Sequence, residues 1–156
     1  MDKTIIPIAS GKGGVGKSFI AANLAVALAE LGKKVIVADL DFGGSNLHTC
    51  LGINNKHPGI GDFIRARYSN LDNLLVETGN DNLKFLAGDV RSPFLANMHH
   101  AQKMRLIYKM KQLKCEYLIL DLGSGSTYNT LDFFSMTQQG MIISTTEHTS
   151  TTNMLT

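Results

Sequence analysis

The sequence predicts an α/β fold, in which a mostly parallel sheet carries helices on both faces in a three-layer α/β/α arrangement. Short apolar runs alternate with longer segments of helical periodicity, as they do when crossover helices join parallel strands. Several of these runs contain no polar residue, which is typical of strands buried on both faces. We find no repeat and no linker, so we expect residues 1–156 to form a single domain.

The first forty residues predict two strands joined by a helix. Residues 4–9 form an apolar run, although Pro7 cannot donate a ladder hydrogen bond and therefore weakens regular pairing. A helix is expected over residues 17–31, where apolar residues recur at helical spacing. Its apolar face consists of Ile20, Leu24, Leu28 and Leu31. Residues 35–38 are continuously apolar and predict a second, buried strand.

The rest of the chain predicts a looser segment followed by further strands and helices. Glycine, proline and asparagine are frequent between residues 42 and 82, so we expect loops there, with short helices near 62–68. Strands are expected at 75–76, 84–87, 117–120 and 140–145, and a helix at 97–113. An apolar stripe on that helix indicates core packing. The stripe consists of Met98, Ala101, Met104, Ile107 and Met110.

The composition is that of an ordinary globular protein. Apolar residues make up 44% of the 156 residues, charged residues make up 18%, and the formal net charge is +2. A dense basic patch is lacking, so the composition does not favour nucleic acid as a partner of this segment. One mild cluster of basic residues is interpreted as a solvated helix face. It consists of Lys103, Arg105, Lys109, Lys111 and Lys114.

Targeting and redox features favour a cytoplasmic location. The first residues lead directly into a strand and do not resemble a signal peptide, and the longest apolar runs are shorter than the ~18 residues of a membrane helix. Cys50 and Cys115 lie far apart without a CxxC pattern, which predicts two buried, reduced thiols. The pair His99 and His100 has no second cluster of metal-ligating residues, which favours a solvated helix start over a metal site.

A glycine-rich loop between the first strand and the first helix is the strongest functional signal. Residues 10–18 read SGKGGVGKS and fit the phosphate-loop pattern G-x-x-x-x-G-K-[ST]. Glycines let the backbone wrap around a phosphate, and the following helix N-terminus attracts negative charge. We expect a P-loop NTPase fold whose loop holds ATP or ADP. The expected nucleotide-binding residues are Gly11, Lys12, Gly13, Gly14, Val15, Gly16, Lys17 and Ser18.

The types of the last two loop residues predict their chemistry. Lys17 is expected to bridge the β- and γ-phosphates, and the Ser18 hydroxyl to ligate Mg²⁺. A plain glycine-rich turn is the alternative. An apolar strand before the loop and an amphipathic helix after it favour the phosphate loop.

Three carboxylates follow predicted strands. Asp39 and Asp41 come after residues 35–38, and Asp121 comes after residues 117–120. Each alone is explained by a turn or a helix cap, but the carboxyl ends of parallel strands meet at one edge of a sheet, where ligands bind. We therefore expect these residues to handle Mg²⁺ and water. Gly123 is expected to let a backbone N–H approach the γ-phosphate.

Three segments of the sequence resemble those of a known family. Residues 12–18, KGGVGKS, resemble the deviant Walker A motif KGGxGK[ST] of the MinD/ParA/nitrogenase iron protein group, whose signature is the extra lysine, Lys12. Residues 39–41 (DLD) resemble its switch I, and residues 121–125 (DLGSG) its switch II. Together with residues 145–150, these segments look closest to the MinD-like branch that includes the FlhG/FleN flagellar-number regulators.

The resemblance implies an ATP-dependent switch. Two subunits would face each other across two ATP molecules, with Lys12 reaching the partner's nucleotide. Asp41 would activate the attacking water, and Asp121 would hold Mg²⁺ through water. The resemblance also implies regulation of cell division, polar placement or flagellar assembly through protein partners that the sequence does not identify.

The sequence departs from the family pattern in three places. Phe19 replaces a common threonine, which we expect to alter packing rather than activity. Residues 146–150, TEHTS, lack two prolines of the family segment. Relative to the family the chain looks C-terminally truncated, so adenine contacts and the membrane-binding helix of MinD are not expected within it.

Two other function classes stay open. One is an ATP-dependent enzyme of the same fold, such as a synthetase or a reductase, although neither Cys50 nor Cys115 has the surroundings of a cluster ligand. The other is a module that binds nucleotide without turnover. Ser124, Ser126 and Thr127 do not form a nucleophile elbow and are interpreted as loop or helix-cap residues.

Overall fold

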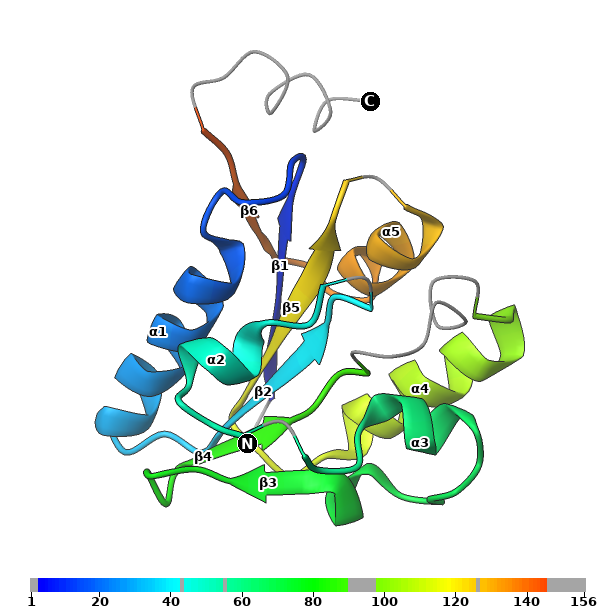
Figure 1. Cartoon of the computed structure of the whole chain (residues 1–156), viewed down its shortest axis with the longest axis horizontal. Coiled ribbons are helices and arrows are strands. Elements are labelled where there is room, and N and C mark those ends of the chain that lie inside the picture. Colours follow the sequence, from blue (N-terminus) through cyan, green and yellow to red (C-terminus); the bar gives the residue numbers. More distant parts are fainter. Residues whose placement is uncertain (1–2, 43, 55, 90–97, 126, 146–156) are drawn as a thin grey trace.

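The computed structural model describes residues 3–42, 44–54, 56–89, 98–125 and 127–145, and its centre is a six-stranded sheet with the order β3-β4-β2-β5-β1-β6 (Figure 1). The strands are β1 (Thr4–Ser10), β2 (Val35–Leu40), β3 (Leu75–Glu77), β4 (Leu83–Leu86), β5 (Tyr117–Ser124) and β6 (Met141–Ile143). Every pairing is parallel except that of β3 with β4. All the expected strands are present, and Pro7 lies within β1 opposite Leu120.

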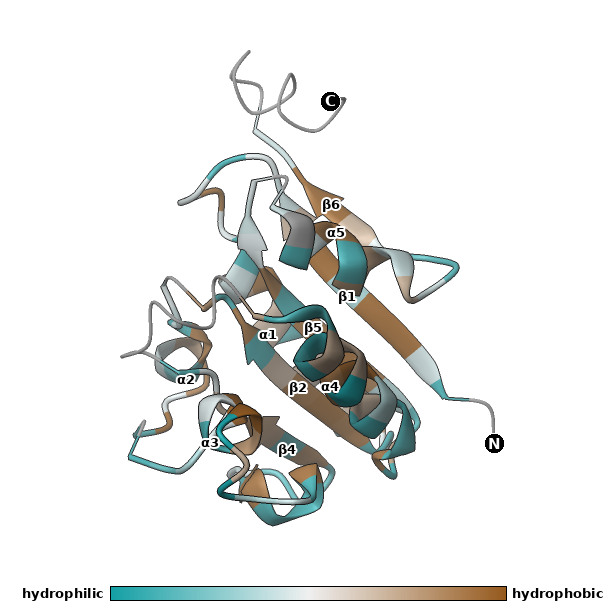
Figure 2. Ribbon diagram, turned by 90° about the vertical axis from the view of Figure 1, so that its right-hand side faces the viewer, coloured by the Kyte–Doolittle hydropathy of each residue, from teal (hydrophilic) through white to brown (hydrophobic). Residues whose placement is uncertain are grey.

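The helices form a layer on each face of the sheet. They are α1 (Lys17–Glu30), α2 (Leu47–Cys50), α3 (Ile60–Ile64), the 3₁₀ turn η1 (Leu71–Leu74), α4 (His100–Gln112) and α5 (Tyr128–Ser135). Because side chains alternate along a strand, Val35 and Val37 pack toward α1 and α2, whereas Ile36 and Ala38 pack toward α3, α4 and α5. In Figure 2 the central strands are brown along most of their length, as expected of strands buried on both faces.

Two strands run further than expected, and this changes where the carboxylates lie. β2 continues to Leu40 and β5 to Ser124, so the ladder pairs Asp39 with Asp121 and Leu40 with Leu122. Neither aspartate therefore follows a strand as predicted. Both side chains are 0% exposed and lie on the α1 side of the sheet, the side toward which Val37 and Ile119 also point.

The predicted leucine face of α1 is not the face that packs on the sheet. Ala21, Ala22, Ala25 and Ala29 are buried there, whereas Leu31 is 76% exposed. Leu24 and Leu28 are partly buried at the edge of this contact. Small side chains allow the helix backbone to approach the valine and isoleucine side chains of the strands closely, which explains why alanines occupy this face.

α4 also differs from its predicted pattern. Met98, Ile107 and Met110 are buried as expected, but Ala101 and Met104 are exposed. Lys103, which we expected to be solvated, is buried and forms an ion pair with Asp132 of α5.

The cysteines differ from expectation in one respect. Cys50 is exposed rather than buried, while Cys115 is half-buried, and both thiols are free. Burial raises the pKa of the Cys115 thiol to about 11, so it stays protonated at neutral pH.

Candidate nucleotide site

The glycine-rich loop leads from β1 directly into α1. Gly14 and Gly16 have φ angles of +78° and +91°, which residues with a Cβ rarely adopt. Gly16 caps α1, and its carbonyl accepts a hydrogen bond from the Ile20 N–H at 3.0 Å. The first helical residues, Lys17 and Ser18, therefore lie where the positive end of the helix dipole favours an anion.

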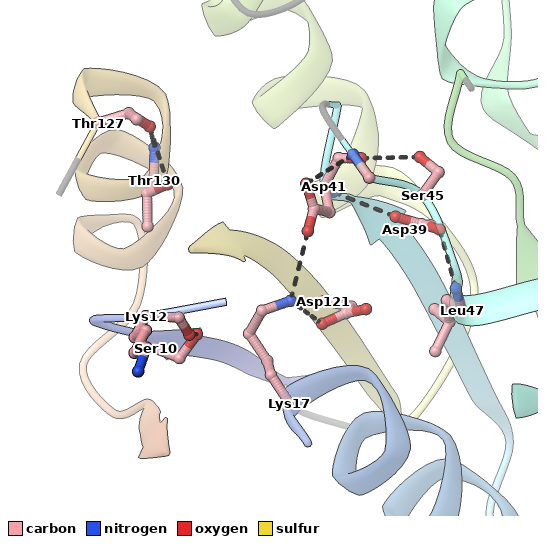
Figure 3. Close-up of polar contacts among 11 residues, drawn as sticks. Ser10, Lys12, Lys17, Asp39, Asp41, Ser45, Leu47, Asp121, Thr127 and Thr130 are labelled. Atoms are coloured by element: carbon pink, nitrogen blue, oxygen red, sulfur yellow. Dashed lines mark hydrogen bonds and ion pairs between the residues drawn. The ribbon is translucent and has the colours of Figure 1, made fainter. Parts of the chain in front are cut away.

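Lys17 is held by carboxylates from two neighbouring strands. Its side chain is 6% exposed, and its ammonium lies 2.6 Å from Asp121 Oδ1 and 4.0 Å from Asp41 Oδ2 (Figure 3). Asp121 also interacts with the Ser18 hydroxyl. The structure thus brings together four residues that the sequence predicted for one site, although they are up to 104 positions apart.

Asp121 has unused capacity for a ligand. Burial raises the pKa of its carboxyl, while Lys17 and the Ser18 hydrogen bond act in the opposite direction. Its buried Oδ2 atom has no hydrogen-bond partner among the described residues. A buried oxygen without a hydrogen-bond partner lowers the stability of the fold. Asp121 Oδ2 is therefore suited to accept a hydrogen bond from metal-bound water.

Asp39 organises the loop that follows β2. Its carboxylate accepts hydrogen bonds from the N–H groups of Asp41 at 3.1 Å and Leu47 at 3.2 Å. Burial, helped by the charge of Asp121, raises the pKa of Asp39 to about 7, and the two N–H donors only partly oppose this. The sequence grouped Asp39 with the other carboxylates without predicting this buried, positioning contact.

We expect the Asp39 carboxyl to make stability depend on pH. Its folded-state pKa of about 7 lies above the ordinary value of 3.8, so the stability that this carboxyl contributes is present below that ordinary value and is lost as the pH rises toward 7. In EDTA without nucleotide, the free energy of unfolding should fall by on the order of 3 kcal/mol between about pH 5 and about pH 8 because of this group. Urea denaturation at both values should show a flatter dependence for Asp39→Asn. An equally steep fall in the variant would contradict this assignment.

Asp41 lines a cleft. Its side chain is 25% exposed, and Oδ1 accepts a hydrogen bond from the Gly44 N–H at 3.1 Å. The cleft measures about 390 Å³ and lies between the loop after β2, the end of β5 and α5. Its lining residues include Asp41, Phe42, Gly123, Thr130 and Phe133. Sequence reasoning missed Thr130, because no motif marks a residue on the helix that follows β5.

Lys12 lies apart from Lys17, the other charged residue of the loop. It is exposed, and its ammonium is directed away from Lys17, Asp41 and Asp121 (Figure 3). The Ser10 hydroxyl donates to its carbonyl at 3.0 Å, which fixes the backbone at this point. Phe19, on the first turn of α1, is 64% exposed.

The structure also tests the predictions for the helix cap and the histidine pair, within the residues that it describes. Thr127 caps α5 as expected, because its hydroxyl oxygen accepts the Thr130 N–H at 3.2 Å. His99 and His100 are exposed at the start of α4. Within the described ranges, His, Cys, Asp and Glu form no group of three that could hold a metal, so Mg²⁺ would also need phosphate and water oxygens. Residues 146–150 and Ser126 lie outside the description.

The parallel sheet with strand order β4-β2-β5-β1, together with the loop that enters α1, defines a P-loop nucleotide-binding protein. A family model described as ParA, the NUBPL iron-transfer P-loop NTPase, matches residues 2–155. The chain therefore belongs to the ParA family of P-loop NTPases.

Curated relatives agree with this assignment. The septum site-determining protein MinD of Synechocystis sp. is 35% identical over 145 residues, which cover 92% of this chain and 53% of that protein. The antiactivator FleN of Pseudomonas aeruginosa is 31% identical over 150 residues, which cover 96% and 53%. The chain thus spans about half the length of these relatives.

Solved structures match as well. MinD from Pyrococcus horikoshii, complexed with Mg-ADP, has a TM-score of 0.84 at 27% identity and covers 97% of this chain, which covers 62% of that one. MinD in the MinC:MinD complex of Aquifex aeolicus matches with a TM-score of 0.79 at 27% identity, over 96% of this chain and 60% of that one. These matches confirm the MinD-like P-loop fold.

None of the helices in the described part of the chain combines the length and apolar character needed to cross a bilayer.

Proposed function

We propose that the chain is an ATP-binding and ATP-hydrolysing switch of the MinD/ParA type, which dimerises in its ATP state and acts on partner proteins. The observation that carries the proposal is the convergence of Lys17, Ser18, Asp121 and Asp41 at the start of α1. This set contains a cation for phosphates, a hydroxyl and a carboxylate suited to hydrated Mg²⁺, and a second, partly exposed carboxylate.

In this proposal Lys17 exchanges partners when ATP binds. Its ammonium is buried against Asp121 and directed at Asp121 and Asp41, so it is already dehydrated. ATP phosphates would share this charge, while loop N–H groups and the N–H of Gly123 contact phosphate oxygens. Mg²⁺ would be held by Ser18 and, through water, by Asp121, and would neutralise charge on the β- and γ-phosphates.

Asp41 is the proposed activator of the attacking water. It lies 4.0 Å from the Lys17 ammonium, so it is close to where the γ-phosphate would contact Lys17. It also lines the cleft, from which water can approach. A carboxylate in this position can orient the water and accept a proton from it.

Lys12 is the proposed contact between subunits. It is exposed on the loop and directed away from its own Lys17 cluster, which suits a lysine that reaches another molecule. A cation supplied in trans neutralises charge that develops on the γ-phosphate. Because ADP lacks the γ-phosphate, dimerisation would be linked to the ATP state.

The relatives suggest the kind of partner. MinD of Aquifex aeolicus was solved in a complex with MinC, and FleN is named an antiactivator. We therefore propose protein partners in cell division, polar placement or flagellar regulation. The cysteines do not favour a reductase, since Cys50 is exposed on α2 and Cys115 is half-buried before β5.

We expect Lys12→Ala to abolish ATP-dependent dimerisation. The measurement is sedimentation of the full-length protein carrying Asp41→Ala, which blocks turnover, with ATP-Mg²⁺ or ADP-Mg²⁺. ATP should give dimers and ADP monomers. Adding Lys12→Ala should give monomers with both nucleotides, because each ATP loses the cation from the other subunit, while ADP affinity should stay within about twofold.

A matched lysine serves as the control. Lys84 is exposed, pairs with Glu77 and lies on β4 rather than on the loop, so Lys84→Ala should dimerise as the parent does. Two results would contradict the proposed contact of Lys12 with the other subunit's ATP. One is an oligomeric state that is the same with ATP and with ADP, and the other is a Lys12→Ala variant that dimerises normally with ATP. In the protein with Asp41 intact, nucleotide binding without phosphate release would instead support a binding module.

A further inference from the structure

The backbone of Asp41 is held by two buried side chains. Its N–H donates to Asp39 Oδ1 at 3.1 Å, and its carbonyl accepts the Ser45 hydroxyl at 2.8 Å (Figure 3). Asp39 is 0% exposed and Ser45 is 3% exposed, so bulk water competes little for either hydrogen bond. The residue with the proposed role in water activation is therefore fixed on both sides of its Cα atom.

Asp41 depends on such contacts because it lies where the chain leaves the sheet. β2 ends at Leu40, so Asp41 is the first residue beyond the strand. Its carboxylate is directed at Lys17, whereas its backbone lies toward Asp39 and Ser45 (Figure 3). A rotation of this backbone would swing the partly exposed carboxylate away from Lys17, so the backbone contacts determine where the carboxylate lies.

The Ser45 hydroxyl is in turn placed by the loop after β4. A Cβ atom on Gly88 would lie 2.5 Å from Ser45 Oγ and 2.8 Å from the Asp39 carbonyl oxygen, which is closer than real Cβ atoms approach. Because Gly88 has no Cβ, this loop packs directly against Ser45 and Asp39. The hydroxyl that supports Asp41 is thus confined by its neighbours.

We propose that Ser45 is a positioning residue for ATP hydrolysis, an inference that rests on the proposed ATPase function. By donating to the Asp41 carbonyl, Ser45 holds the Asp41 carboxylate beside Lys17, where the γ-phosphate is expected. It acts through Asp41 rather than on the nucleotide. Since reacting groups have to be held within a fraction of an ångström, loss of this hydroxyl slows the chemical step and leaves ATP binding unchanged.

Turnover by variants of Ser45 tests this assignment in the full-length protein. Ser45→Ala removes the hydroxyl, so kcat should fall about 5- to 50-fold while KM and ATP affinity change less than about twofold. Ser45→Cys keeps a side chain of similar size with a weaker donor, so its kcat should lie between those of Ser45→Ala and the wild type.

Ser135→Ala is the matched control for loss of a hydroxyl. The Ser135 hydroxyl also donates to a backbone carbonyl, that of Asp132 at 3.1 Å, but it lies on α5 and does not contact Asp41. Its loss should leave kcat equal to that of the wild type.

A double-mutant cycle separates the positioning of Asp41 from a general role in the fold. In the Asp41→Asn background, adding Ser45→Ala should lower the single-turnover rate by less than about twofold, because the side chain that Ser45 positions can no longer accept a proton. A general role in the fold would lower the rate equally in both backgrounds, together with Tm.

Three results would overturn the assignment and leave the ATPase function intact. They are wild-type kcat in both Ser45 variants, a raised KM with unchanged kcat, and an equal loss of rate in the two backgrounds. A wild-type protein that hydrolyses no ATP would overturn the proposed function and this assignment with it.

Discussion

Lys17→Ala should lower ATP affinity at least about 100-fold, measured by nucleotide titration. Two charge-assisted hydrogen bonds to phosphate oxygens are worth about 1.5–3 kcal/mol each, and their loss corresponds to this factor. The burial of the ammonium strengthens the expectation, because Lys17 is 6% exposed and lies between the carboxylates of Asp121 and Asp41.

Loss of the fold has to be distinguished from loss of binding in this variant. Removing Lys17 leaves the buried Asp121 without its counter-ion, which is itself destabilising by about 3–5 kcal/mol. The double variant Lys17→Ala/Asp121→Asn removes both charges, so it should recover thermal stability while ATP affinity stays low. Lys84→Ala, on β4 rather than on the loop, should bind ATP as the wild type does. Equal ATP affinities for Lys17→Ala and the wild type would refute the phosphate-loop assignment.

Asp41 substitutions should separate hydrolysis from binding. Asp41→Ala should retain ATP within a few fold and lose turnover by about 10²–10⁴, the range for removal of a general base. Asp41 is the least buried of the three carboxylates and follows β2 rather than lying within it, so its removal leaves the sheet intact. Single-turnover phosphate release and ATP titration measure the two effects independently.

The isosteric variant Asp41→Asn isolates the charge. It keeps an acceptor for the Gly44 N–H but cannot take a proton from water, so its turnover should be as low as that of Asp41→Ala. Asp81→Asn is a control on an exposed turn before β4, and its turnover should equal that of the wild type. An Asp41→Ala variant that hydrolyses ATP at the wild-type rate would remove the role proposed for this residue.

Local sequence patterns were sufficient for the elements that frame the site. The glycines at 14 and 16 have the positive φ angles that a phosphate loop requires, and the strand before and the helix after the loop are where the pattern predicted them. The short strands at Leu75–Glu77 and Leu83–Leu86 were predictable for the same reason, since apolar runs bounded by turn residues depend on neighbours in sequence.

What the tertiary structure decided depends on residues far apart in the chain. The 2.6 Å contact between Lys17 and Asp121 follows from the parallel register of β2, β5 and β1, which no local pattern encodes. The same register buries Asp39 opposite Asp121 and raises its pKa to about 7. The packing of α1 through alanines, and the burial of Lys103 against Asp132, likewise depend on the facing surface of another element.

The sequence by itself therefore determined that this chain carries a phosphate loop, which three carboxylates accompany it, and the α/β class of the fold. Helical and strand periods and glycine conformations act over a few residues, so they can be read from the chain directly. Only the tertiary structure decided that Asp39 is a buried positioning group, that Lys12 is directed away from its own cluster, and that Thr130 lines the same cleft as Asp41. These features depend on distances between side chains of different elements, which strand register and helix packing set together.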